Sequence, residues 1–111
     1  MRLLVLGAGV SGMAVCRLAR AQGHSVTIYD ESPVEPGRII GMGAGVVTGA
    51  WDAGLLDGVD LVVASPGFPE RSLPIVETLE SGVPVWSEIE YSWRALGGRP
   101  VVAVTGTNGK T

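Results

Sequence analysis

Short apolar runs recur along the chain and predict the strands of a buried sheet. Residues 3–6 are uninterrupted apolar residues, and residues 61–64 repeat that pattern. Residues 25–29 are rich in β-branched and aromatic side chains. Such runs are typical of strands buried on both faces of a parallel sheet. Two weaker patterns, at 43–49 and 83–86, predict further strands, although glycines weaken the first.

Segments with helical spacing of apolar residues separate these strands. The predicted helical segments are residues 10–22, 38–42, 51–56, 74–81 and 88–96. In the fourth we expect Ile75, Val76 and Leu79 to face inward. In the last, Ser87 and Glu90 have the spacing of a capping box. The alternation predicts an α/β fold, a Rossmann-like parallel sheet of about five strands with helices on both faces.

The first strand runs directly into a glycine-rich turn. Gly7, Gly9 and Gly12 stand at the G-x-G-x-x-G spacing. Gly7 allows a sharp turn, Gly9 leaves no Cβ between backbone and phosphate, and Gly12 lets helix and strand pack closely. The free N–H groups at the start of the helix point at an anion. The motif therefore predicts a nucleotide-phosphate site, without saying which nucleotide it binds.

Two further segments are expected at the same edge of the sheet. Asp30 ends the second strand about 20 residues after the glycine turn, where dinucleotide-binding domains place the carboxylate that holds a ribose hydroxyl. A strand-end aspartate can also simply start a turn. The loop at 65–67 follows the strand at 61–64. Because the carboxyl ends of parallel strands line the ligand crevice, we expect this loop beside the glycine turn and Asp30.

The last residues of the chain carry a second phosphate-binding pattern. After an apolar run at 100–104, the chain ends in the Walker A pattern G-x-x-x-x-G-K-[ST], with Val104 in the first position. Lys110 would neutralise phosphate charge, and the Thr111 hydroxyl would reach Mg²⁺. In P-loop folds this loop runs into a helix. We therefore expect one complete domain over 1–98 and the first strand and loop of a truncated ATP-binding domain over 99–111.

The composition of the chain limits which binding partners and which cellular compartment we expect. The 111 residues carry a formal net charge of −3 and no cluster of Lys or Arg, which argues against nucleic-acid binding. The single cysteine, Cys16, lies in the first helical pattern and is expected to be buried in a reducing cytoplasm. No apolar run approaches the roughly 20 residues that a membrane span requires. We expect a cytoplasmic monomer without nucleic-acid or membrane partners.

Four motifs together resemble the amino-terminal part of a Mur ligase. They are the glycine turn at 7–12, Ala-Ser-Pro-Gly at 64–67, Ser-Glu-Ile-Glu at 87–90 and Val-Thr-Gly-Thr-Asn-Gly-Lys-Thr at 104–111. The last is specific to the wider ligase family, which includes folylpolyglutamate synthetases. The first two point to the member that adds D-glutamate to UDP-N-acetylmuramoyl-L-alanine in peptidoglycan synthesis. The resemblance covers essentially the whole chain.

The resemblance implies that the first domain binds the UDP moiety of the substrate. The residues it assigns to UDP are Val10, Ser11 and Gly12 (diphosphate), Asp30, Glu31 and Ser32 (uracil and ribose), Ser65 and Gly67 (crevice), and Asn108 (sugar side). The residues it assigns to ATP are Gly106, Thr107, Asn108, Gly109, Lys110 and Thr111, the last also holding Mg²⁺. Glu31 and Ser32 depart from the hydroxyl and basic residue that the family often has there.

In an intact enzyme of this family, ATP phosphorylates the substrate carboxylate and the amine of D-glutamate attacks the acyl phosphate. The resemblance implies that this chain alone is inactive, because it lacks the rest of the ATP-binding domain and the carboxyl-terminal domain of the family. An NAD(P)- or FAD-binding domain of an oxidoreductase would fit the glycine turn and Asp30 equally well, but it leaves residues 106–111 unexplained. A non-catalytic interaction module is also compatible with the sequence, as is a Mur ligase that adds a different amino acid.

Overall fold

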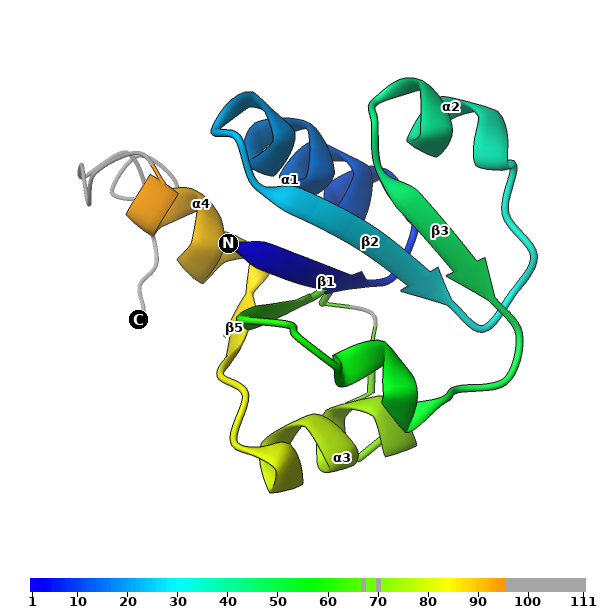
Figure 1. Ribbon diagram of the computed structural model, residues 1–111, viewed down its shortest axis with the longest axis vertical. Helices are drawn as coiled ribbons and strands as arrows, with labels where there is room; N and C mark the ends of the chain where they lie inside the picture. The colour runs from blue at the N-terminus through cyan, green and yellow to red at the C-terminus, as the bar shows by residue number, and fades with distance from the viewer. Residues whose placement is uncertain (67, 70, 96–111) are drawn as a thin grey trace.

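The computed structural model describes residues 1–66, 68, 69 and 71–95, which form a parallel α/β sandwich. Its five strands pair in the order β3-β2-β1-β4-β5, with β1 at the centre (Figure 1). The strands are β1 (Arg2–Leu6), β2 (Ser25–Asp30), β3 (Gly45–Thr48), β4 (Leu61–Ala64) and β5 (Val85–Ser87). All four pairings are parallel, which confirms the predicted sheet. The predicted strand and loop at 99–111 lie outside the described residues.

Helices cover both faces of the sheet. They are α1 (Val10–Ala21), α2 (Pro36–Gly41), the 3₁₀ helix η1 (Ala53–Leu56), α3 (Leu73–Ser81) and α4 (Glu88–Ala95). α1 and α2 lie on one face, whereas η1 and α3 lie on the other (Figure 1). α4 packs against α1 and β5. No helix in the described part of the chain has the length and apolarity needed to cross a membrane.

β1 separates two apolar cores. Leu3 and Val5 face the core beneath α1, whereas Leu4 and Leu6 face the core beneath α3. All four side chains are fully buried. Because successive side chains of a strand point to opposite faces, a strand covered on both sides must be apolar throughout. This explains the uninterrupted apolar run from which the strand was predicted.

The inward face of α3 differs from the prediction. Ile75 is buried as expected, but Val76 is 37% exposed and Leu79 is 62% exposed. Pro74 and Thr78 take the inward positions instead. The Thr78 hydroxyl donates a hydrogen bond to the Pro74 carbonyl oxygen at 2.6 Å, so this polar side chain can be buried without losing a partner.

Several element boundaries differ from the prediction by one or two residues, and two of these differences have identifiable reasons. β5 begins at Val85 instead of residue 83, because Pro84 has no N–H to donate to the ladder, although its carbonyl oxygen accepts from the Val62 N–H. The segment predicted at 51–56 forms the 3₁₀ helix η1, which begins after Asp52. The Asp52 carboxylate accepts from the Gly54 N–H at 2.9 Å and caps that turn.

α4 begins with half of the predicted capping box. The Ser87 hydroxyl oxygen accepts a hydrogen bond from the Glu90 N–H at 3.0 Å. The Glu90 carboxylate does not return to the cap and instead pairs with Arg94 one turn along the helix. Arg94 also lies over the ring of Trp86 at 4.6 Å, which ties α4 to β5.

Candidate functional site

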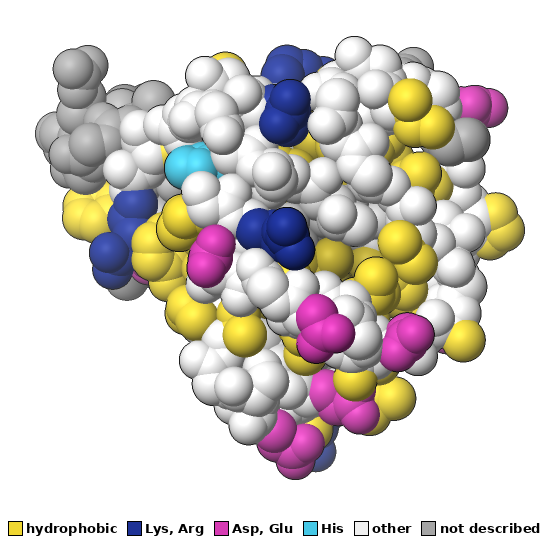
Figure 2. Space-filling model, viewed as in Figure 1, with side chains coloured by type: hydrophobic (Ala, Val, Ile, Leu, Met, Phe, Trp, Pro, Cys, Tyr) yellow, Lys and Arg dark blue, Asp and Glu magenta, His cyan; other side chains and the backbone are white. Residues whose placement is uncertain are grey.

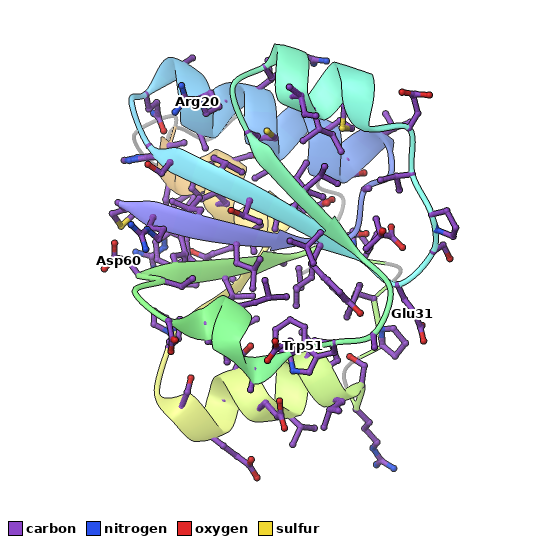
Figure 3. All side chains as sticks on the ribbon, turned by 45° about the vertical axis from the view of Figure 1, so that its right-hand side comes forward. Arg20, Glu31, Trp51 and Asp60 are labelled. Atoms are coloured by element: carbon purple, nitrogen blue, oxygen red, sulfur yellow. The ribbon has the colours of Figure 1, made fainter. Side chains whose placement is uncertain are left out.

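A cleft of about 690 Å³ lies at the carboxyl edge of the sheet, within the size range of small-molecule sites. Its lining comes from the ends of β1, β2, β3 and β4 and from the start of α3. The lining residues are Gly7, Gly9, Tyr29, Asp30, Glu31, Ser32, Ala50, Trp51, Ser65, Phe68, Pro69, Ser72, Leu73 and Pro74. Figure 3 shows Glu31 and Trp51 at this edge, whereas Arg20 and Asp60 lie at the opposite edge.

The glycine turn closes the cleft beside β1, and two of its positions require glycine. Gly7 has a φ of +108°, and a Cβ there would lie 2.9 Å from the Ser65 Cβ. A Cβ on Gly12 would lie 2.0 Å from the Gly7 carbonyl oxygen. Gly12 is buried, so it serves the close packing of α1 on the turn, as the motif predicts.

The start of α1 faces open space. A Cβ on Gly9 would meet no atom within 4 Å. The Met13 N–H bonds to the Gly9 carbonyl oxygen, so the N–H groups of Val10, Ser11 and Gly12 come before the first bond of the helix and have no acceptor within it. Gly9 caps the helix without a side-chain hydrogen bond, and Val10 is 91% exposed. N–H groups without an acceptor in the helix, together with the helix dipole, suit an anion here.

Asp30 connects two loops of the cleft. One of its carboxylate oxygens accepts from the Ala8 N–H and the other from the Ser32 N–H, both at 2.9 Å. The side chain therefore fixes the glycine turn and also turns the chain after β2. A carboxylate oxygen can accept more than one hydrogen bond, so a ribose hydroxyl can still bind. Glu31 and Ser32 follow as exposed residues at the rim of the cleft.

Ser65 lies where the sequence placed it, beside the glycine turn and Asp30. Its N–H donates to the Leu6 carbonyl oxygen at 3.0 Å, which continues the pairing of β4 with β1. Its own carbonyl oxygen accepts from the Phe68 N–H at 2.9 Å. The remaining predicted site residues lie outside the described residues. They are Gly67, Gly106, Thr107, Asn108, Gly109, Lys110 and Thr111.

The apolar wall of the cleft was not predicted from the sequence. Trp51, Phe68, Leu73 and Pro74 form it together with Pro69. Trp51 follows the carboxyl end of β3, so the strand-end rule that was applied to β2 and β4 would also have found it. The contribution of α3 carries no such local signal, because its first turn reaches the cleft only through the tertiary fold.

A buried carboxyl group behind the start of α1 was also missed. Glu88, the first residue of α4, is 6% exposed and is hydrogen-bonded to the Ser11 side chain. Burial raises the pKa of the Glu88 carboxyl group, and the hydrogen bond from Ser11 partly opposes that rise. Its Oε2 atom has no hydrogen-bond partner among the described residues. Ser11 is therefore tied to α4 as well as placed at the helix start.

The described residues contain no group of three or more His, Cys, Asp or Glu side chains able to hold a metal ion. The charged side chains visible over η1 and α3 are mostly acidic, and no broad basic patch appears on the face that Figure 2 shows. Cys16 is buried in α1, as predicted. The cleft offers a fixed carboxylate and an apolar wall, and the start of α1 beside Gly9 offers backbone N–H groups for an anion.

Comparison with known proteins identifies the family. Residues 1–87 match the family of Mur ligase MurD-like N-terminal domains. The chain is 42% identical to UDP-N-acetylmuramoylalanine–D-glutamate ligase of Anaeromyxobacter dehalogenans, over 99% of this chain and 25% of the relative. It is 44% identical to the ligase of the same name from Frankia casuarinae, over 98% of this chain and 24% of the relative. The chain thus spans about a quarter of the length of these relatives.

Solved structures agree on the fold. A murein peptide ligase from Psychrobacter arcticus superimposes with a TM-score of 0.73 at 28% identity, over 85% of this chain and 20% of that one. UDP-N-acetylmuramate-alanine ligase from Thermotoga maritima superimposes with a TM-score of 0.74 at 20% identity. The match covers 87% of this chain and 23% of that one. The matches give no support to an oxidoreductase. Because the family model covers residues 1–87 and both relatives are more than 40% identical over nearly the whole of this chain, the chain belongs to the Mur ligase family, as a MurD-like amino-terminal domain.

Proposed function

We propose that this chain binds the UDP moiety of UDP-N-acetylmuramoyl-L-alanine, as part of an ATP-dependent ligase that adds D-glutamate during peptidoglycan synthesis. One observation carries the proposal: Gly9, which opens α1 and has open space beside it, lines the same cleft as the Asp30 carboxylate. The relatives that carry the name of this ligase support the choice of substrate.

Each part of the ligand has matching groups in the cleft or beside it, at the start of α1 next to Gly9. The diphosphate would bind the N–H groups of Val10, Ser11 and Gly12, where the helix dipole favours negative charge. The ribose hydroxyls would bind Asp30, whose carboxylate is already oriented by two backbone N–H groups. Glu31 and Ser32 would contact the nucleoside from the rim, and Ser65 and Gly67 would close the crevice.

In this proposal the described residues make no bond in the reaction. They hold the uridine end of a long substrate, while the reacting carboxylate lies at its other end. Residues 1–98 would form the UDP-binding domain, and residues 99–111 would begin the ATP-binding domain. There, Gly106 to Thr111 would hold ATP and Mg²⁺, Asn108 would also contact the sugar side of the substrate, and the chain alone would have no ligase activity. A cytoplasmic location and a monomeric state belong to the same proposal.

Calorimetric titration of the 111-residue chain with UDP, and separately with NADH, tests the proposal. We expect saturable binding of UDP and none of NADH, because the cleft is expected to recognise uridine and its diphosphate. Binding of NADH alone would contradict the ligase assignment and favour a dinucleotide-binding domain instead. Binding of neither would contradict the proposal that this chain is sufficient to bind the nucleotide.

A further inference from the structure

We propose that Trp51 is the surface on which the uracil ring of bound UDP stacks, and that Glu77 is a positioning residue that holds the indole ring in place. This inference rests on the proposed binding of UDP and specifies how the base is recognised. Neither residue belongs to a motif of the sequence. They meet only because the segment after β3 passes over α3 (Figure 3).

The orientation of the Trp51 ring is fixed by two elements. The indole N–H donates a hydrogen bond to Glu77 Oε1 on α3 at 2.6 Å. The ring also packs against Tyr29 of β2, with centroids 5.2 Å apart and an angle of 80° between the planes. Edge-to-face packing and a charge-assisted hydrogen bond each restrict rotation of the ring. The cleft therefore has a preorganised aromatic wall, which lowers the entropic cost of binding a flat ligand.

The polarity of the cleft places the base at this wall. Its polar part is the glycine turn with Asp30, and its apolar part is Trp51 with Phe68, Leu73 and Pro74. A nucleoside diphosphate has the same division, with an anionic end and a flat aromatic end. With the diphosphate at the start of α1 and the ribose at Asp30, the base extends toward Trp51. Every base has a π-face that can stack on an aromatic side chain.

The Glu77 carboxylate affects ligand binding by orienting Trp51, and it need not contact the ligand. Glu77 is absent from the lining of the cleft, whereas Trp51 is part of it. Replacing Glu77 by Gln keeps an acceptor for the indole N–H, but replacing it by Leu removes the acceptor. The two variants therefore separate the hydrogen bond from the bulk of the side chain.

Titration of Trp51→Leu with UDP, and with inorganic pyrophosphate as a probe without a base, is the test. We expect the Kd for UDP to rise about 5- to 150-fold, the range typical of losing one stacked base, and the Kd for pyrophosphate to stay within about twofold. Trp51→Phe should keep most of the affinity for UDP. Trp93→Leu, at an exposed position of α4 outside the cleft, is the matched control and should leave both values unchanged.

Fluorescence provides a second readout that a purely structural role would not move. In a chain with Trp86→Phe and Trp93→Phe, Trp51 is the remaining tryptophan, since the sequence holds three. UDP should quench its emission, and pyrophosphate should not. Glu77→Leu should weaken UDP binding and reduce the quenching, whereas Glu77→Gln should preserve both.

The outcomes separate this inference from the proposed function. If the unchanged chain binds UDP but Trp51→Leu binds it equally well, the stacking proposal alone is wrong. An equal loss of UDP and pyrophosphate binding would also overturn it, because Trp51 would then only shape the cleft. If the unchanged chain does not bind UDP, both proposals fail. Circular dichroism melts of each variant show whether a loss of binding reflects a loss of folding.

Discussion

At the scale of single residues, Asp30 serves both the fold and the proposed ligand. Its carboxylate oxygens accept from the N–H groups of Ala8 and Ser32. Asp30→Ala should therefore weaken UDP binding and also lower the melting temperature, because hydrogen bonds to a charged group contribute about 1.5–3 kcal/mol. Calorimetric titration and differential scanning calorimetry measure the two effects.

Asp30→Asn is the matched control for that experiment. The amide keeps one oxygen as an acceptor and loses the charge, so it should be less destabilising than Asp30→Ala. If the Asp30→Ala variant has the same melting temperature as the unchanged chain, the structural role that we assign to the hydrogen bond between Asp30 and Ala8 is wrong. Unchanged affinity for UDP would remove Asp30 from the binding site.

Glu88 should make stability depend on pH. Burial raises the pKa of this carboxyl group in the folded chain above its unfolded value. As the pH rises from the unfolded pKa through the folded one, the unfolded chain loses this proton first, so the free energy of unfolding falls. Above the folded pKa the loss is complete. Glu88→Gln should remove this decline and melt higher than the unchanged chain near pH 8.

Thermal melts between pH 4 and pH 8 test the Glu88 prediction. The difference in melting temperature between Glu88→Gln and the unchanged chain should grow with pH and then level off. Glu90→Gln is a suitable control, since Glu90 is also in the first turn of α4 but its carboxylate is exposed and pairs with Arg94. If the melting temperatures of Glu88→Gln and the unchanged chain differ by the same amount at every pH, burial of the Glu88 charge does not cause the pH dependence of stability.

At the scale of elements, the junction of β1 and α1 depends on two glycines in different ways. A Cβ on Gly12 would meet the Gly7 carbonyl oxygen at 2.0 Å, whereas a Cβ on Gly9 would meet nothing within 4 Å. Gly12→Ala should destabilise the chain by about 3 kcal/mol, the upper end of the usual cost of overpacking, because the backbone must move to relieve the contact. Chemical denaturation followed by circular dichroism measures this loss.

Gly9→Ala is the informative partner of that variant. Its φ of −74° is accessible to alanine, so the melting temperature should stay the same or rise slightly. Its new methyl group would occupy the space proposed for the diphosphate, so the affinity for UDP should fall. A Gly9→Ala chain that binds UDP normally would place the diphosphate elsewhere.

The element boundaries show where local sequence information suffices. β4 was predicted with the observed bounds, because an apolar run between polar loops leaves one possible strand. The inward face of α3 was predicted wrongly at Val76 and Leu79, because the rule assigns polar residues to the outside. Thr78 is an exception to that rule, because its hydroxyl bonds to a carbonyl oxygen of its own helix and can therefore be buried. Its burial becomes visible only in the packing of α3 against the sheet.

At the scale of the whole molecule, both faces of the sheet should unfold together. Leu4 and Val5 are neighbours in β1 but belong to different cores, and each is fully buried. Leu4→Ala should lower the free energy of unfolding by about 2–5 kcal/mol. Leu79→Ala, at an exposed position of α3, should change it by less than about 0.5 kcal/mol. Urea unfolding followed by circular dichroism and by tryptophan fluorescence measures both changes.

Coincident transitions by the two probes would confirm one cooperative unit for both cores. In a Trp86→Phe, Trp93→Phe background, where Trp51 is the remaining tryptophan, a fluorescence transition that precedes the circular dichroism transition in Leu4→Ala would show instead that the core beneath α3 melts separately. In that case the wall of the cleft formed by Trp51 and the start of α3 would loosen before the glycine turn does.

The amino-acid sequence by itself determined the parallel α/β class, the position of the glycine turn and the edge of the sheet where a ligand is expected. These follow from local chemistry: apolar runs that must be buried on both sides, and glycines at positions that a Cβ would block. Only the tertiary structure decided which side chains meet there. The contacts of Trp51 with Glu77, and of Ser11 with Glu88, join residues far apart in the chain. Crossovers and packing create such pairs, and no local pattern encodes them.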